Sequence, residues 1–149
     1  MRNIPMNRFE ATKLGSPEAW LIEAAASIGL DFAGFSHEVT NHFENHVIKR
    51  HGKGPLAITE KDFERIPGIV KAPDMAIIGA LRGGVLINAY AKMETGATYL
   101  YFEEVLGSTH SKALRSRTFY KIIKPLDLTG FEKIVTMNGI TDITRAKKI

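Results

Sequence analysis

Four of the five histidines lie in residues 35–52, FSHEVTNHFENHVIKRHG. Apolar residues recur there at every fourth position, the spacing that lines one face of an α-helix, which predicts a helix from about Ser36 to His51. His51 continues the apolar face and precedes a glycine, a residue suited to end a helix. Imidazole has an ordinary pKa of about 6.5, so His46 and His51 are candidates for proton transfer, with Lys49 beside them as a cation.

Residues 114–123 alternate hydroxyl groups with cations in the pattern of a β-strand. The hydroxyl face is predicted to consist of Leu114, Ser116, Thr118, Tyr120 and Ile122, and the basic face of Arg115, Arg117, Phe119, Lys121 and Ile123. Hydroxyl, Arg and Lys side chains are the donors that bind phosphate oxygens. Because the two faces point apart, both can serve one phosphate only if the strand twists or bulges. The alternative is an edge strand whose cations prevent pairing with other chains.

Together these residues predict the parts needed for metal-independent RNA cleavage. That reaction requires a base for the 2′-hydroxyl proton, an acid for the leaving 5′-oxygen, and donors around the developing negative charge. His46 and His51 point about 140° apart on a regular helix, so they straddle one phosphate only if the helix turns near Arg50. Otherwise one of them acts with a residue of the strand. Alternatively, His51 is a cation that stabilises the negative end of the helix dipole.

A zinc hydrolase is a further alternative. His42 and His46 are four residues apart, as are the zinc-binding histidines of H-E-x-x-H, and Glu38 lies one turn earlier. Phe43 stands where that motif has its glutamate, so the motif is absent and no metal ligand is predicted. The chain has no cysteine, so any metal would need His and carboxylate ligands. No cofactor is predicted.

The elements that would position these residues belong to one domain over residues 1–149. Its parts are an arm (1–15), a helical part (16–67), an antiparallel sheet (73–123) and a basic C-terminal extension (124–149). Period-two patterns and glycine-rich turns predict strands at about 75–81, 85–93, 98–106 and 114–123, with 131–135 as a candidate fifth. The fold class is α+β, with N-terminal helices packed on a four- or five-stranded antiparallel meander. Lys92, near the end of the second strand, is a further candidate to bind substrate.

Capping signals mark the limits of two helices. The run SPE at residues 16–18 predicts a helix start, with a serine cap, proline in the first turn and an acid near the positive end of the dipole. Thr59 and Asp62 have the spacing of a capping box. The short helix that they begin is expected to stop by the Pro-Gly pair of residues 67–68.

Charge is distributed unevenly along the chain, whose net charge is +4. Residues 112–149 contain 9 of the 20 Lys and Arg residues but only 3 of the 16 Asp and Glu residues. This basic segment predicts a polyanionic partner, most simply RNA, and the alternative is a solvated basic surface. No apolar run approaches the roughly 20 residues that span a bilayer, and no signal peptide is evident. No membrane partner is therefore predicted, and the expected location is the cytoplasm of the producing or target cell.

Several short motifs resemble those of one group of nucleases. They are His46-Val47-x-Lys49-x-His51-Gly52, Ile58-Thr59-x-x-Asp62 with Ile66-Pro67, Pro73-Asp74, Tyr90-x-Lys92 and Thr118-x-Tyr120-Lys121. Over about residues 35–123 the chain resembles the phage-associated branch of the barnase–EndoU–colicin–RelE-like superfamily. The resemblance implies a compact α+β fold and metal-independent RNA cleavage that leaves a cyclic phosphate. It points to His46, Lys49, His51, Thr118 and Tyr120 as the site.

The predicted function is a metal-independent endoribonuclease of toxin or phage-effector type, producing 2′,3′-cyclic phosphate ends. Its substrate would be bound by Arg115, Arg117, Lys121, Lys92 and Ser116. RNA is the expected partner, with tRNA as one candidate, and an immunity or antitoxin protein with an acidic surface would protect the host. The alternative on the same fold is an inactive RNA- or protein-binding module, which would bind RNA in a salt-dependent way without turnover.

Overall fold

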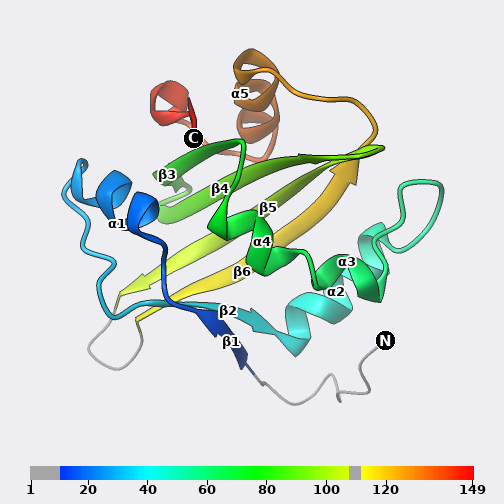
Figure 1. Ribbon diagram of the computed structural model, residues 1–149, viewed down its shortest axis with the longest axis horizontal. Helices are drawn as coiled ribbons and strands as arrows, with labels where there is room; N and C mark the ends of the chain where they lie inside the picture. The colour runs from blue at the N-terminus through cyan, green and yellow to red at the C-terminus, as the bar shows by residue number, and fades with distance from the viewer. Residues whose placement is uncertain (1–10, 108–111) are drawn as a thin grey trace.

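The computed structural model of the chain describes residues 11–107 and 112–149, so residues 1–10 of the predicted arm lie outside the described part. The described residues form a seven-stranded sheet in the order β1-β2-β6-β5-β4-β3-β7 (Figure 1). Its strands are β1 (Ala11–Gly15), β2 (Ser36–Thr40), β3 (Met75–Arg82), β4 (Val85–Glu94), β5 (Ala97–Gly107), β6 (Lys112–Ile122) and β7 (Lys147–Lys148). The helices are α1 (Ala19–Ala26), α2 (Asn41–His51), α3 (Glu60–Phe63), α4 (Ile66–Lys71) and α5 (Leu128–Met137), with a 3-10 turn η1 (Ile143–Arg145). None of the helices described here is long and apolar enough to cross a membrane.

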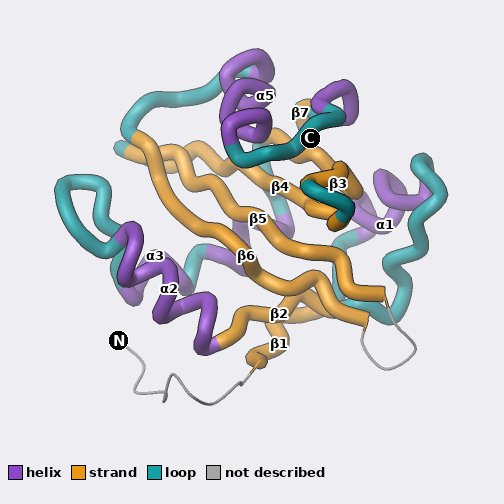
Figure 2. Tube along the Cα trace, turned by 180° about the vertical axis from the view of Figure 1, so that it is seen from behind, coloured by secondary structure: helices purple, strands orange, loops and turns teal. Residues whose placement is uncertain are grey.

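Helices lie on both faces of the sheet. Helices α1, α3 and α4 lie on one side and α5 with η1 on the other, as Figures 1 and 2 show from opposite directions. Each face has its own hydrophobic core. The first includes Leu21, Phe43, Ile66, Tyr101 and Phe119, and the second includes Ile77, Leu100, Phe102, Phe131 and Val135. We call the sheet surface under the first core the α1 face and the surface under the second core the α5 face.

The predicted α+β class is confirmed, as is the antiparallel meander at its centre. Strands β3, β4, β5 and β6 pair in that order, close to the predicted limits. The sheet is larger than predicted, because β1, β2 and β7 extend it at both edges. The fifth strand predicted at 131–135 is wrong, because these residues lie in α5. Asp127 caps that helix, and Phe131 and Val135, one turn apart, both face the second core.

The histidine helix begins five residues later than predicted. Residues 36–40 form β2, which pairs antiparallel with β1 and parallel with β6. The helix α2 starts at Asn41, where the Thr40 hydroxyl accepts a hydrogen bond from the backbone N–H of Phe43 at 3.0 Å. The every-fourth apolar spacing did not reveal the boundary, because an even spacing also keeps residues on one face of a strand. Val39, in β2, therefore faces the same core as the apolar residues of α2.

The predicted arm is wrong for residues 11–15, which form the strand β1. Its register with β2 pairs Ala11 with Thr40 and Lys13 with Glu38. Four of the five residues of β1 are exposed, and the fifth, Leu14, packs against the first core. The strand therefore lacks the alternating pattern by which a half-buried strand is found in a sequence.

The other helix limits depend on where proline is tolerated. The capping box of Thr59 and Asp62 is confirmed. The helix that this box begins stops before residues 67–68, as predicted, because α3 ends at Phe63. A separate helix that was not predicted, α4, follows and has its proline in the first turn, where a helix needs no backbone N–H donor. The start predicted at residues 16–18 is too early. Helix α1 begins at Ala19, with Glu18 in the capping position and no side-chain cap.

Asp62 links α3 to the α1 face of the sheet through hydrogen bonds. Its Oδ2 accepts hydrogen bonds from the backbone N–H of Thr59 at 2.8 Å and from Lys121 Nζ at 3.2 Å, and its Oδ1 accepts one from the Tyr99 hydroxyl at 2.6 Å. Burial raises the pKa of Asp62, but these hydrogen bonds outweigh burial and hold that pKa below its ordinary value. Burial and the bond to Asp62 raise the pKa of Tyr99 to about 12.

Replacing Asp62 with asparagine is expected to lower the free energy of unfolding at neutral pH by about 1–3 kcal/mol, because three donors lose a charged acceptor. The folded-state pKa of Asp62 is depressed, so its contribution is present above the ordinary value of 3.8 and is lost as the pH falls through the folded value. Urea unfolding of both proteins at neutral pH and at about pH 3 measures this. The difference between them should shrink at the lower pH, and a constant difference would contradict the assignment.

Candidate functional site

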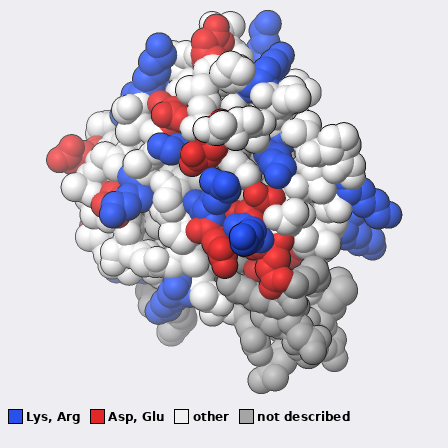
Figure 3. All heavy atoms as spheres, turned by 45° about the vertical axis from the view of Figure 1, so that its right-hand side comes forward, with Lys and Arg blue, Asp and Glu red and all other residues white. Residues whose placement is uncertain are grey.

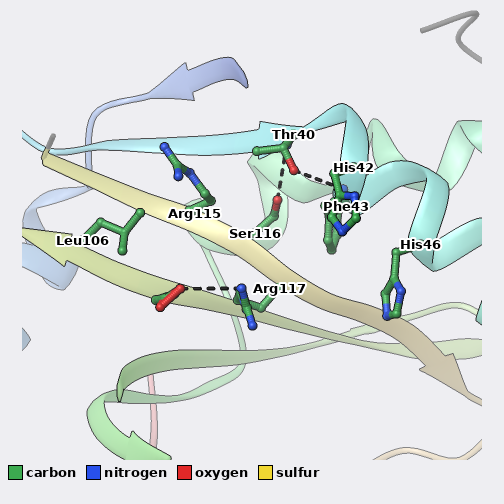
Figure 4. Close-up of a pocket in the computed structure, with 9 residues that line it drawn as sticks. Thr40, His42, Phe43, His46, Leu106, Arg115, Ser116 and Arg117 are labelled. Atoms are coloured by element: carbon green, nitrogen blue, oxygen red, sulfur yellow. Dashed lines mark hydrogen bonds and ion pairs between the residues drawn. The ribbon is translucent and has the colours of Figure 1, made fainter. Parts of the chain in front are cut away.

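A pocket opens where β2 ends and α2 begins. Its volume is about 340 Å³, and it lies between the first turns of α2 and the strands β5 and β6 (Figure 4). The lining residues are Thr40, His42, Phe43, His46, Glu104, Leu106, Arg115, Ser116 and Arg117. Two segments distant in the sequence, β2 with α2 and β5 with β6, thus bring imidazole, guanidinium, carboxylate and hydroxyl groups to one pocket.

A β-bulge in β6 decides which of its side chains share a face. Thr118 lies opposite Phe102, but the next pair is Ser116 with Glu103, so Arg117 is the extra residue. Phe102 belongs to the second core, and Arg117 forms an ion pair on the same α5 face. The predicted regular alternation of residues 114–123 is therefore wrong. The bulge brings Arg115, Arg117, Thr118 and Tyr120 to the α5 face and leaves Ser116 and Lys121 directed away from it.

Carboxylates hold both arginines of the pocket in place. Arg117 Nη1 lies 3.6 Å from Glu104 Oε1, and Arg115 Nη2 lies 3.3 Å from Glu38 Oε1. Arg117 is half exposed, with a side-chain exposure of 51%. Figure 3, which brings the right-hand side of Figure 1 forward, shows acidic and basic side chains interleaved on that face of the molecule. In the pocket itself, the two guanidinium groups are each oriented by a carboxylate.

Two imidazoles of α2 line the pocket. His42 and His46 are four residues apart and so lie on one side of the helix, next to β6 (Figure 4). The pKa of His46 lies below its ordinary value of 6.5, first because of partial burial and then because of the charges of Arg50, His42, Arg117 and Lys49. At neutral pH the His46 ring is consequently neutral and able to accept a proton.

His51 lies beside the pocket and not in its lining. Its ring stacks on Tyr120, with 5.5 Å between ring centres and 25° between planes, and Tyr120 stacks in turn on Phe102. The Tyr120 hydroxyl accepts a hydrogen bond from Asn138 Nδ2 at 3.1 Å, and burial raises its pKa. Burial and the charges of Arg50 and His46 lower the pKa of His51. This stack places a row of aromatic rings at the C-terminal end of α2.

The remaining predicted residues lie at different distances from this site. Thr118 is half-buried on the α5 face next to Arg117. Lys49 is exposed on α2, outside the pocket lining, although its charge acts on His46. Lys121 is bound to Asp62 on the α1 face, and Lys92 Nζ donates to the backbone oxygen of Ala72 at 2.8 Å. The structure therefore does not bring these two lysines to the pocket.

The ligand set considered for zinc is not assembled. Glu38 lies in β2, where it pairs with Arg115, and not one helical turn before His42. Over residues 11–107 and 112–149, no group of three or more His, Cys, Asp or Glu side chains is placed to share a metal ion.

Sequence reasoning missed Glu104 and considered His42 only as a zinc ligand. Glu104 lies directly opposite Arg115 across the β5–β6 pair and beside Arg117. Opposite charges on neighbouring strands of a hairpin are a usable signal, because directly paired residues interact. The spacing of four residues between His42 and His46 was a usable signal that the two rings lie on one side of a helix. That this side faces β6 became clear only from the structure.

The chain matches the family model described as phage-Barnase-EndoU-ColicinE5/D-RelE like nuclease 3 over residues 17–127. No curated protein and no solved structure matches the chain. The matched range includes β2, α2, β5 and β6, the elements that build the pocket. Since the match spans well over half of the 149 residues, the chain belongs to the phage-Barnase-EndoU-ColicinE5/D-RelE like nuclease 3 family.

Proposed function

We propose that this nuclease is an endoribonuclease that cleaves RNA without a metal ion and leaves 2′,3′-cyclic phosphate ends. The observation that carries the proposal is the convergence of two imidazoles, His42 and His46, and two guanidinium groups, Arg115 and Arg117, on one pocket of about 340 Å³. Imidazoles can exchange protons near neutral pH, and guanidinium groups bind phosphate in a bidentate manner. Together they match the needs of a phosphoryl transfer in which the RNA supplies its own nucleophile.

In the proposed reaction, His46 accepts the proton of the 2′-hydroxyl as the 2′-oxygen attacks phosphorus. Its lowered pKa keeps it in the neutral form that a base needs. His42, one helical turn away in the same pocket, gives a proton to the 5′-oxygen as the bond from phosphorus to that oxygen breaks. One proton is taken up and one is released, so the protein is restored when the two rings exchange protons with water.

The strand β6 is proposed to hold the phosphate during this step. Arg115 and Arg117 stabilise the negative charge that develops on the phosphorane oxygens. Glu104 and Glu38 orient these guanidinium groups through the ion pairs described above. Thr118 and Tyr120, on the same face, are positioning donors, and the Tyr120 hydroxyl remains able to donate because it accepts from Asn138. Outside the lining, Lys49 helps to lower the pKa of His46 through its charge, and His51 stacks on the Tyr120 ring.

The test is incubation of the purified chain in EDTA with total tRNA and with a labelled single-stranded RNA, beside His42→Ala and His51→Ala. We expect the wild type to produce cyclic-phosphate ends, His42→Ala to be about 10²–10⁴-fold slower, and His51→Ala to retain much more activity. Activity that needs an added divalent metal would overturn the metal-free mechanism. RNA binding that weakens with salt, with no turnover, would identify an inactive binding module instead.

The same guanidinium groups suggest how a partner would control the enzyme. We infer that a neutralising immunity or antitoxin protein would present carboxylates to Arg115 and Arg117, because these groups are already paired with carboxylates in the chain itself.

A further inference from the structure

The His51 ring is held by stacking and by no hydrogen bond. It is half-buried at the last position of α2 and lies on the Tyr120 ring, which itself stacks on Phe102 of the second core. Among the residues that the structure describes, no second aromatic ring packs on His51, and its ring nitrogens make no hydrogen bond or ion pair. The imidazole therefore has one face against Tyr120, and no described polar group binds its nitrogens.

The Tyr120 ring that supports His51 is held from two sides. Phe102 stacks on it, with 6.4 Å between ring centres and 10° between planes. Its hydroxyl accepts a hydrogen bond from Asn138 Nδ2 at 3.1 Å, and the same nitrogen donates to the backbone oxygen of Ile134 at 2.8 Å. A ring that arrives from solution thus meets side chains that are already ordered, so little conformational entropy is lost when it stacks.

Helix α2 and strand β6 both lead from the pocket to this stack. Strand β2 is parallel to β6 and α2 continues from β2, so α2 passes along β6 in the direction of rising residue numbers (Figure 4). His46 and His51 are about 7.5 Å apart along the helix axis, at 1.5 Å per residue. Arg117 and Tyr120 are about 10 Å apart along the α5 face of β6, at 3.3 Å per residue. One nucleotide can span this distance from its 3′-phosphate to its base.

The proposed roles of the two pocket histidines set the direction of the RNA along α2. His42 protonates the leaving 5′-oxygen and His46 takes the proton of the attacking 2′-hydroxyl, so the nucleotide with that hydroxyl lies on the His46 side of the phosphate. His51 follows His46 in the same direction along α2. The base of the attacking nucleotide is therefore the one that reaches the rings of His51 and Tyr120.

Resting on the function proposed above, we propose that the stacked rings of His51 and Tyr120 are the subsite for the base on the 5′ side of the cleaved bond. The base stacks on the imidazole and extends the row of rings by one member. Stacking on an aromatic side chain favours every base, and it favours purines over pyrimidines because their ring surface is larger. The enzyme therefore prefers a purine before the cut, and it requires no hydrogen bond to a particular base edge.

The test uses trinucleotides with one cleavable bond, in which a single ribonucleotide stands between two deoxythymidines. The ribonucleotide carries adenine, uracil or, at the 1′-carbon of its sugar, only hydrogen. For the wild type we expect kcat/KM with adenine to exceed that of the abasic substrate by about 10- to 100-fold, with uracil between them. His51→Ala should slow cleavage of the adenine substrate about 10-fold and change cleavage of the abasic substrate by less than about twofold. His51→Phe, which keeps a ring but has no nitrogens, should retain most of the adenine advantage.

Arg65→Ala is the matched control, because Arg65 is a half-exposed side chain over another aromatic ring, that of Tyr99, on the opposite α1 face. It should leave the ratio of adenine to abasic cleavage unchanged. An equal loss on all three substrates in both His51→Ala and His51→Phe would place His51 in proton transfer and overturn the proposal. A wild type indifferent to the base, or a preference that His51→Ala leaves intact, would also overturn it.

A failure of the proposed chemistry is distinguishable from a failure of this subsite. If the wild type cleaves no RNA, an uncleavable all-deoxy oligonucleotide with 2-aminopurine as its only base is titrated with the protein. This base loses fluorescence when it stacks, so the wild type and Arg65→Ala should quench it, and His51→Ala should weaken the quenching about fivefold or more. No quenching by the wild type, or equal quenching by His51→Ala, would reject the subsite whatever the protein does to RNA.

Discussion

Replacing His46 with alanine is expected to lower kcat/KM for RNA cleavage by about 10²–10⁴-fold, the typical contribution of general acid–base catalysis. The side chain is exposed, so the free energy of unfolding should change by less than about 0.5 kcal/mol. Single-turnover cleavage of a labelled RNA, beside urea unfolding, separates the two effects. Activity close to that of the wild type would remove His46 from the reaction, and a large loss of stability would make the activity uninformative.

The pH profile gives a second, independent view of His46. Because its pKa is lowered by burial and then by Arg50, His42, Arg117 and Lys49, the rising limb of kcat/KM should have its midpoint below pH 6.5. Arg50→Ala removes the largest of these charges without removing the imidazole, so the midpoint should move up toward 6.5. A midpoint that Arg50→Ala leaves unmoved, or one above 6.5 in the wild type, would contradict the assignment.

The largest loss of stability is expected from Glu103→Ala. Glu103 is fully buried in β5, on the α1 face, and its carboxylate is bound by three donors. His37 Nδ1 lies 2.7 Å from Oε1, Asn88 Nδ2 donates to Oε2 at 3.0 Å, and the Tyr90 hydroxyl donates to the same oxygen. Removing the acceptor leaves three buried polar groups without a partner. We expect the free energy of unfolding to fall by about 3–5 kcal/mol in urea titrations.

Two variants sharpen that measurement. Glu103→Gln keeps an oxygen acceptor but loses the charge, so it should lie between alanine and the wild type. Glu104→Ala is the neighbouring change on the α5 face of the same strand and should cost less than about 1 kcal/mol, since Glu104 is only partly buried and its partner Arg117 is half exposed. Equal effects of Glu103→Ala and Glu104→Ala would show that the buried network contributes little.

The parts of the fold that depend on residues close together in the sequence could be predicted from the sequence. The meander could be predicted because apolar and polar residues alternate along its strands and its turns contain glycine. The Thr59–Asp62 capping box could be predicted because it involves residues only three apart. The strands β1, β2 and β7 are short, and their pairing partners are distant in the sequence. β2 was also hidden by a spacing of four that suits both a helix and a strand. A short stretch of sequence does not show whether such a segment is a strand, because that depends on distant pairing partners.

The site was predicted in part for the same reason. The residue types of α2 and β6 selected His46, Arg115 and Arg117 as site candidates, and the structure places these three together. The face of each β6 residue could not be predicted, because the bulge at Arg117 is set by pairing with β5. Glu104 comes from β5, the hairpin partner of β6, and its place opposite Arg115 depends on the register of that pair. Lys121 and Lys92 carried the right charge but have partners elsewhere.

The C-terminal segment has a consequence for how this nuclease is divided into units. The family match ends at residue 127, yet Phe131, Val135 and Ile140 fill the second core, and Asn138 donates a hydrogen bond to Tyr120. A fragment cut to the matched range would expose Ile77, Leu100 and Phe102 to water and would lose one wall of the site. The range that matches the family model is thus shorter than the part of the chain that folds together. A fragment for laboratory work should therefore include the residues after 127 that complete the second core.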